Sequence, residues 1–194
     1  MPVVLGSRSA DRAAEAAAEL ASSLGPDAAA LTGTDNAAAA AAADVVVVAV
    51  PWDGHRELLA GLAGVLAGKV VVDCVNPLGF DRQGAHALAV PEGSATQQAA
   101  ALLPGSTVVG AFHHVSAVLL LDTAVTAVDL DVLVLGDDRA ATDLVQALAS
   151  VVPGMRGVYG GRLRNAAQVE ALTANLISVN RRYQVHAGIR LTDV

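Results

Sequence analysis

Aromatic residues, cysteine and clustered positive charge are all scarce in this 194-residue sequence. Aromatic residues make up only 3% of a chain that is 54% hydrophobic, so the core must be built from Ala, Val and Leu. The formal net charge of −7 and the scattered basic residues argue against nucleic acid or an anionic membrane surface as a partner. The single cysteine, Cys74, excludes an intramolecular disulfide framework and indicates a reducing, cytoplasmic location.

Long hydrophobic segments are also missing. The longest apolar stretch, residues 37–50, is interrupted by Asp44, and we expect it to form a helix and then a strand rather than a membrane span. The sequence does not open with a basic segment followed by a hydrophobic one. We therefore expect neither a membrane span nor a signal peptide.

Helical and strand patterns alternate along the chain. Runs such as Val45–Val50 and Val70–Val72 are typical of strands buried on both faces, and helices of about 10 to 15 residues separate such runs. This order predicts an α/β fold with a Rossmann-like, doubly wound parallel sheet. The expected strands are 3–5, 28–31, 45–50, 70–72, 107–110, 131–135 and 157–159. The expected helices are 10–24, 34–43, 56–66, 95–103, 140–151 and 163–185.

Three further features of the organisation follow from the pattern. Gly25 and Pro26 are expected to end the first helix. Residues 78–93 are polar and contain glycine, so we expect a loop there. We divide the chain into a nucleotide-binding domain, residues 1–118, and a small C-terminal α/β lobe with a long helix, residues 119–194.

The first expected strand ends in a polar turn that suits a phosphate group. Gly6, Ser7 and Arg8 follow Val3–Leu5, and Arg12 comes one helical turn later. In dinucleotide-binding folds an acidic residue at the tip of the second strand selects NAD, whereas an arginine there accepts the 2′-phosphate of NADP. This turn holds no acidic residue, so it predicts an NADP clamp. A plain β-turn with a solvated arginine is the alternative.

The sequence does not contain the glycine-rich turn that normally precedes such a clamp. A Rossmann domain opens with a strand, a G-x-G-x-x-G turn and a helix that binds the pyrophosphate, and no G-x-G-x-x-G is present. We therefore hypothesise that Met1 is a misplaced or truncated start. In that case the strands at 3–5 and 45–50 lack the neighbour that belongs between them. The chain as written is then expected to bind NADPH weakly and to be poorly soluble or oligomeric.

In doubly wound sheets ligands bind at the carboxyl ends of the strands. The loops expected there contain Trp52, which is the only tryptophan, and two of the five histidines, His113 and His114. Each of these has a simpler interpretation as a packed loop residue or a strand-end histidine. No carboxylate or cysteine stands at ligand spacing beside the histidines, which argues against a zinc site. We expect Cys74 to be a small buried hydrophobe rather than a nucleophile.

Five segments, in this order and with fitting spacing, resemble the NADPH-dependent coenzyme F420 reductases, also called F420H2:NADP oxidoreductases. The segments are VVLGSRSADR (3–12), VVVVAVPW (45–52), VVVDCVNP (70–77), VGAFHHVSA (109–117) and LGDD (135–138). The combination of Gly-Ser-Arg with Pro-Trp is more specific than either alone. The resemblance implies a homodimer that transfers a hydride between NADP(H) and the deazaflavin coenzyme F420.

The same resemblance assigns residues to three parts of a site. The 2′-phosphate clamp consists of Ser7, Arg8 and Arg12. The wall beside the nicotinamide ribose consists of Val50, Pro51 and Trp52. The pocket in which the two ring systems stack consists of Asn76, Pro77, His113 and Ala117, and Ala187 belongs to a C-terminal segment that closes the deazaflavin site. No residue is assigned as a catalytic acid or base, because both ring systems carry the hydride themselves.

Two other functional classes stay open on the sequence. A reductase like pyrroline-carboxylate reductase would need a proton donor near the nicotinamide and a long helical dimerisation domain. A non-catalytic remnant would result if the first strand and helix had been lost.

Overall fold

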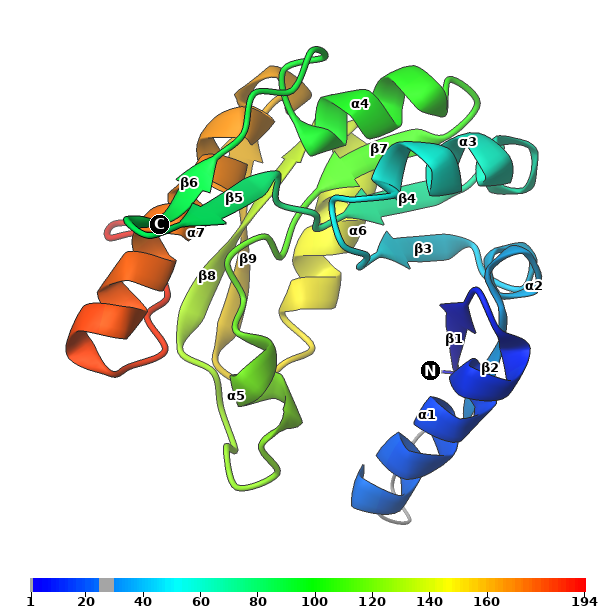
Figure 1. Cartoon of the computed structure of the whole chain (residues 1–194), viewed down its shortest axis with the longest axis horizontal. Coiled ribbons are helices and arrows are strands. Elements are labelled where there is room, and N and C mark those ends of the chain that lie inside the picture. The colour runs from blue at the N-terminus through cyan, green and yellow to red at the C-terminus, as the bar shows by residue number, and fades with distance from the viewer. Residues whose placement is uncertain (1, 25–29) are drawn as a thin grey trace.

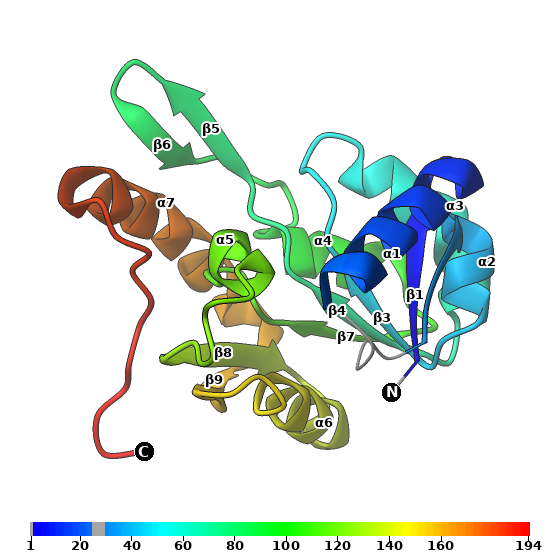
Figure 2. The ribbon, with the colours of Figure 1, turned by 90° about the horizontal axis from the view of Figure 1, so that it is seen from below.

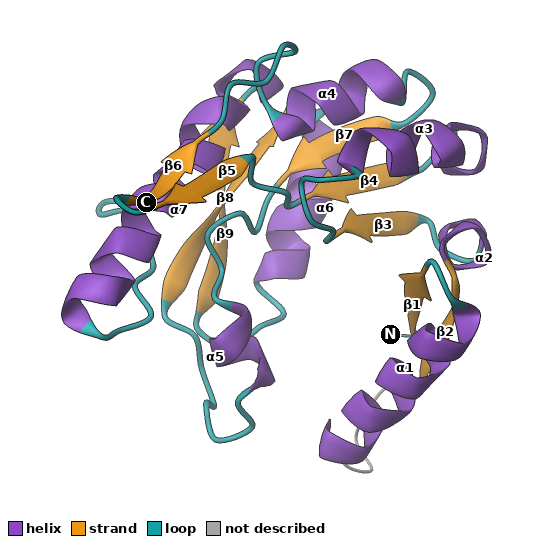
Figure 3. Cartoon of the chain, viewed as in Figure 1, coloured by secondary structure: helices purple, strands orange, loops and turns teal. Residues whose placement is uncertain are grey.

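The computed structural model describes residues 2–24 and 30–194, and helices alternate with strands along the chain (Figures 1 and 3). The strands are β1 (Val3–Ser7), β2 (Leu31–Asp35), β3 (Val45–Val48), β4 (Val70–Asp73), β5 (Leu78–Asp81), β6 (Gly84–Ala87), β7 (Thr107–Gly110), β8 (Leu130–Gly136) and β9 (Met155–Gly161). The helices are α1 (Ala10–Leu24), α2 (Asn36–Ala41), α3 (His55–Leu66), α4 (Ala95–Leu102), α5 (Ala117–Leu121), α6 (Arg139–Ala149), the short 3₁₀ helix η1 (Leu163–Asn165) and α7 (Ala166–Tyr183).

The main sheet has five strands in the order β3-β4-β7-β8-β9. Strands β3, β4 and β7 run parallel, as do β8 and β9, so the expected α/β fold with a mostly parallel sheet is confirmed. The pair β7–β8 is antiparallel, which differs from the all-parallel expectation. The connection between them, residues 111–129, is long enough for a crossover, but its only helix is the five-residue α5, so it does not form the helical crossover of a parallel pair.

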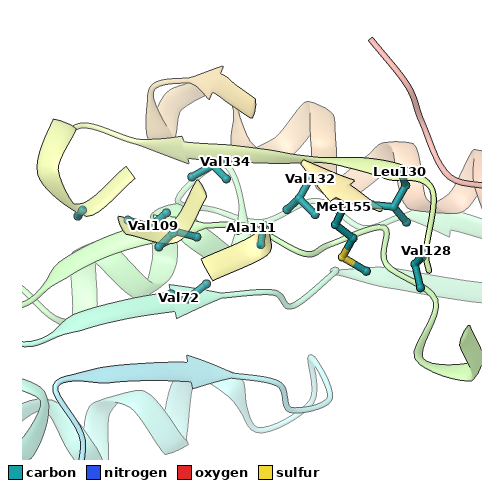
Figure 4. Packing of buried hydrophobic residues seen from close by; sticks show 11 residues of the cluster. Val72, Val109, Ala111, Val128, Leu130, Val132, Val134 and Met155 are labelled. Atoms are coloured by element: carbon teal, nitrogen blue, oxygen red, sulfur yellow. The ribbon is translucent and has the colours of Figure 1, made fainter. Parts of the chain in front are cut away.

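Helices cover both faces of this sheet, as Figure 3 shows. On one face Val71 packs with Leu59 and Leu66 of α3, and α4 adds to the same cluster. On the other face Val72 packs with Val145 of α6, together with the side chains drawn in Figure 4. Neighbouring strand residues thus point to opposite cores, which is the doubly wound arrangement that the β-branched runs predicted.

The N-terminal unit, which we define as β1, α1, β2 and α2, has a sheet of its own. Strand β1 pairs in parallel with β2, from Val3 opposite Leu31 to Ser7 opposite Asp35. No strand in the described part of the chain lies between β1 and β3, as the sequence led us to expect. Strand β3 is consequently an edge strand, so the expectation that 45–50 is buried on both faces is wrong. It ends at Val48, and 48% of Val47 is exposed.

Several local expectations need correction. Residues 78–93 contain the hairpin β5–β6, which lies beside α7 in Figure 2. The hairpin turns sharply because Asp81 Oδ1 accepts hydrogen bonds from the Gln83 and Gly84 amides and Gly84 has a φ of +120°. The strand expected at 28–31 lies at Leu31–Asp35, and the helix stop expected at Gly25 and Pro26 falls outside the described residues.

The C-terminal segment after α7 returns to β8 and is held there by a buried carboxylate. Asp131, fully buried, accepts hydrogen bonds from Arg156 Nε and Nη2, both at 2.7 Å, and from Arg190 Nη1 at 2.6 Å. The Leu191 amide donates to the same carboxylate at 2.7 Å. Strands β8 and β9 follow residue 118 but belong to the same sheet as β3, β4 and β7. The sheet thus crosses the proposed division at residue 118, and the division stays a prediction.

Across residues 2–24 and 30–194, none of the helices combines the length and the apolar character that a membrane crossing requires.

Candidate active site

The predicted phosphate clamp lies where the N-terminal unit meets α3. Ser7 and Arg8 line a pocket of about 340 Å³. Arg8 is exposed, so its guanidinium is free to bind an anion. Ser7 ends β1, which runs two residues beyond the expected strand 3–5. Arg12 is exposed on α1 and does not line this pocket. Ser9 Oγ accepts a hydrogen bond from the Arg12 amide at 3.4 Å, as the N-cap residue of a helix does.

Two carboxylates that the sequence argument had not placed also line this pocket. Asp35 stands opposite Ser7 in the β1–β2 register, and Glu57 comes from α3. The Asp35 carboxylate is already engaged, because its Oδ1 accepts hydrogen bonds from the Ala37 and Ala38 amides and thereby caps α2. The turn itself therefore presents a guanidinium and a hydroxyl. The neighbouring strand β2 adds the Asp35 carboxylate, which already caps α2.

The loops after β3, β4 and β7 lie at one edge of the sheet, because these three strands are parallel neighbours. Asn76 and His113 are joined directly there, since Asn76 Nδ2 donates to the His113 carbonyl at 2.7 Å. Thr173 of α7 donates to the same carbonyl at 3.0 Å. Thr173 was missed by sequence reasoning, and only a prediction that α7 folds back over these loops would have found it. The Pro77 carbonyl accepts from the Leu88 amide, which fastens the base of the hairpin.

The His113 side chain is turned inward. The residue is only 3% exposed, and neither ring nitrogen has a hydrogen-bond partner in the described part of the chain. Burial lowers the pKa of His113 to about 4, so the ring is neutral at physiological pH. The ring packs so close to Gly110 that a Cβ added there would lie 3.1 Å from Nε2. The preceding residue, Phe112, has a φ of 63°, a left-handed conformation that is strained for a bulky side chain.

The structure also brings Ala117 and Ala187 into one region. Ser116 Oγ and His186 Nδ1 are 3.3 Å apart, and these residues directly precede Ala117 and Ala187. The Ala187 amide donates to Asn180 Oδ1 at 2.6 Å, which holds the C-terminal segment against the end of α7. Two segments that are 70 residues apart in the sequence thus meet beside α5.

The predicted ribose wall follows β3. Val50 and Trp52 are half-buried and pack against the α3–α4 core, whereas Pro51 is exposed. The Trp52 ring lies 5.4 Å from the ring of His55, centroid to centroid.

His55 and Asp73 form a buried pair that sequence reasoning did not find. Both residues have no exposed surface, and His55 Nε2 lies 2.7 Å from Asp73 Oδ2. The sequence does carry a signal for this pair, because His55 opens the helix after β3 and Asp73 ends β4, the neighbouring strand. Next to it, burial raises the pKa of the Cys74 thiol to about 12, and its Sγ donates to the Val48 carbonyl. Cys74 is thus an unreactive thiol, as expected.

An α/β sheet with polar loops at the carboxyl ends of parallel strands, together with a pocket lined by Ser7 and Arg8, is the arrangement of the Rossmann-like class of dinucleotide-binding proteins.

Comparison with known proteins identifies the family within this class. A family model described as "NADP oxidoreductase coenzyme F420-dependent" matches residues 2–77. The F420-dependent NADP reductase of Methanothermobacter thermautotrophicus is 36% identical over 197 residues, which cover 99% of this chain and 84% of that protein. Its counterpart from Methanocaldococcus jannaschii is 33% identical over 198 residues, covering 99% and 88%.

A solved structure agrees with these matches. A protein assigned as an F420-dependent NADP reductase from Arthrobacter sp. FB24 superposes with a TM-score of 0.74 at 26% identity, covering 97% of this chain and 88% of that one. The chain belongs to the family of F420-dependent NADP reductases.

Proposed function

We propose that this protein catalyses hydride transfer between NADP(H) and the deazaflavin coenzyme F420. The observation that carries the proposal is the 36% identity to an F420-dependent NADP reductase along 99% of the chain. The pocket beside Ser7 and Arg8 supports NADP as the nucleotide, since a guanidinium and a hydroxyl suit a phosphate dianion.

We assign the roles of the residues from the resemblance to the family. Ser7 and Arg8 bind the 2′-phosphate, and Arg12 adds positive charge from the first turns of α1. The Val50–Trp52 segment forms the wall beside the nicotinamide ribose. Asn76, Pro77, His113 and Ala117 form the pocket for the stacked rings, and Ala187 belongs to the C-terminal segment that closes the deazaflavin site.

The protein's part in the reaction is to orient the two partners and to exclude water. When bound, the nicotinamide and the deazaflavin supply the hydride chemistry themselves. Asn76 and Thr173 hold the loop after β7 in place through its carbonyl at His113, and this loop is part of the proposed ring pocket. His113 contributes this carbonyl, whereas its neutral, buried ring packs against Gly110.

The test is a spectroscopic assay with purified protein. We expect NADPH to bleach the absorbance of oxidised F420 and reduced F420 to reduce NADP, while FMN is a much poorer acceptor. Reduction of FMN without any reduction of F420 would overturn the proposal and indicate a general flavin reductase.

We further propose a homodimer in the cytoplasm. A dimer is supported by α5, on which Val118, Leu120 and Leu121 are 59%, 51% and 66% exposed although all three are apolar. A reducing compartment is supported by the single thiol, Cys74. Light scattering should give twice the mass of the 19.4 kDa chain, and Leu121→Asp should lower it to that of one chain. A monomeric wild-type protein would contradict the proposed dimer.

A further inference from the structure

A chain of buried hydrogen bonds starts at the first residue of α3. His55 is fully buried, and each of its ring nitrogens faces an oxygen atom. Nε2 lies 2.7 Å from Asp73 Oδ2 at the end of β4, and Nδ1 lies 3.0 Å from Gln98 Oε1 in α4. The imidazole therefore bridges the start of α3 to a strand on one side and a helix on the other.

The partners of Gln98 fix the direction of its hydrogen bonds. Its Nε2 donates to Glu92 Oε2 at 3.1 Å, and Glu92 is also paired with Arg56. The hydrogen bond from Arg56 lowers the pKa of Glu92, so this carboxylate is ionised and can only accept. The amide nitrogen of Gln98 must then face Glu92, and its oxygen must face His55. Gln98 Oε1 has no proton to give, so His55 Nδ1 carries one.

The second ring nitrogen is subject to the same argument. Asp73 Oδ2 faces His55 Nε2, while Asp73 Oδ1 accepts a hydrogen bond from the Val75 amide at 2.9 Å. In this arrangement His55 Nε2 donates to Asp73 Oδ2, and both oxygens of Asp73 accept a hydrogen bond. An imidazole that donates from both nitrogens is an imidazolium.

The surrounding charges agree with this protonation state. The groups that face His55 are Asp73 of β4, Gln98 of α4 and, further away, Glu170 of α7. Burial opposes the charge, but the hydrogen bond and the charge of Asp73 outweigh it, so the pKa of His55 is raised. His113, the other histidine near Asp73, is neutral because burial lowers its pKa to about 4. It therefore adds no competing positive charge.

His55 also holds the loop after β3. Its amide donates to the Trp52 carbonyl at 3.1 Å, and the two rings are 5.4 Å apart with an interplanar angle of 32°. A cation close to an indole ring is attracted to it. We infer that His55, as a buried imidazolium anchored by Asp73 and Gln98, is the positioning residue for the Pro51–Trp52 segment. This segment is the ribose wall, so the consequence for catalysis rests on the proposed function.

Trp52 provides a direct test because it is the only tryptophan in the chain. A protonated imidazole quenches a neighbouring indole. We expect the tryptophan emission of the wild-type protein to rise as His55 loses its proton, with a midpoint above 6.5. His55→Gln should abolish this titration, and the matched control His86→Gln, on the exposed hairpin, should retain it. A midpoint at or below 6.5, or a titration that survives in His55→Gln, would overturn the inference.

A second measurement uses the wild-type protein and so does not depend on how well a variant folds. Nitrogen-15 NMR of histidine-labelled protein at pH 6.5 should show one buried ring with both nitrogens protonated. The same signal should be missing from the His55→Gln spectrum. A neutral tautomer for every buried histidine would overturn the inference.

Steady-state kinetics distinguish the positioning role of His55 from a general loss of structure. In His55→Gln we expect KM for NADPH to rise by at least about fivefold, as loss of a charged hydrogen bond implies, while KM for F420 stays within about twofold. In the wild-type protein KM for NADPH should rise with pH along the fluorescence titration, and in the variant it should be flat. If no variant reduces F420 at any pH, the proposed function fails while the fluorescence and NMR results still decide the state of His55. Equal rises in both KM values would overturn the positioning role.

Discussion

The N-terminal unit and the five-stranded sheet are packed in different ways, although both are built from parallel strands and helices. In the five-stranded sheet and the helices that cover it, many fully buried side chains are large, among them Leu59 of α3, Val132 of β8 and Val145 of α6. In the N-terminal unit the buried apolar residues that the structure describes are alanines: Ala13, Ala17, Ala39 and Ala40. Burial stabilises roughly in proportion to apolar area, at about 25 cal/mol per Å². We therefore expect the unit that carries the proposed phosphate clamp to be the less stable part.

Close approach of the backbone replaces side-chain packing in the N-terminal unit. A Cβ added at Gly33 of β2 would lie 2.0 Å from the Ala13 carbonyl oxygen, so α1 rests directly on the strand. Regions with few buried apolar contacts open first. We infer that the clamp opens locally without unfolding of the sheet, and the following predictions test that difference.

The largest effect is expected from a cavity between α3 and the five-stranded sheet. Leu59→Ala removes a fully buried side chain and should lower the free energy of unfolding by about 2–5 kcal/mol. The matched change in the N-terminal unit, Leu5→Ala, affects a half-buried residue and should cost about 1 kcal/mol. Urea denaturation of both variants measures the two values. Equal losses would show that the two regions are equally well packed.

A change confined to the N-terminal unit should damage it alone. Gly33→Ala places a methyl group against the α1 backbone and should cost about 3 kcal/mol locally. Hydrogen exchange should then show lost protection in β1 and α1, with β4 and β8 unchanged. The control is Gly61→Ala in α3, where an added Cβ meets nothing within 4 Å. Loss of protection in β8 would mean that the two regions unfold together.

The sequence predicted those parts of the fold that depend on local pattern. The first strand and the turn after it, the β-branched strands β3 and β4 and the helix α6 follow from residues next to one another. The isolation of β1 from β3 also followed, because the order of strands in a doubly wound sheet is known.

Pairings across the fold could not be predicted in the same way. Asp35 reaches the clamp through the β1–β2 register, and Thr173 meets Asn76 across 97 residues. The contact between His55 and Asp73 depends on which strands become neighbours. Such contacts depend on tertiary geometry, and periodicity carries no information about it.

Cofactor choice tests the function of the less stable region. Arg8→Ala should remove most of the preference for NADPH over NADH, since a charged hydrogen bond contributes about 1.5–3 kcal/mol. That corresponds to a loss of more than about tenfold in the ratio of the two kcat/KM values. Arg139→Ala, on the exposed surface of α6, is the control and should leave the ratio unchanged. Equal use of both nucleotides by the wild-type protein would contradict the clamp.

The smallest effect expected is a dependence of stability on acid that arises only in the sheet. Hydrogen bonds from Arg156 hold the pKa of Asp131 below its usual range. A carboxylate with a lowered pKa in the folded state stabilises the protein above its unfolded pKa of about 3.9, and this contribution is lost as pH falls through the folded value. Asp131→Asn should therefore be less stable than the wild type at neutral pH. This gap in stability between the two proteins should close below pH 4. Asp11→Asn is the matched variant in α1, because this carboxylate accepts no hydrogen bond from an arginine among the described residues. Thermal unfolding from pH 7 to pH 3 measures both gaps. A gap for Asp131→Asn that does not vary with pH would mean that its arginine contacts add no net stability, and the two regions would then differ in apolar packing alone.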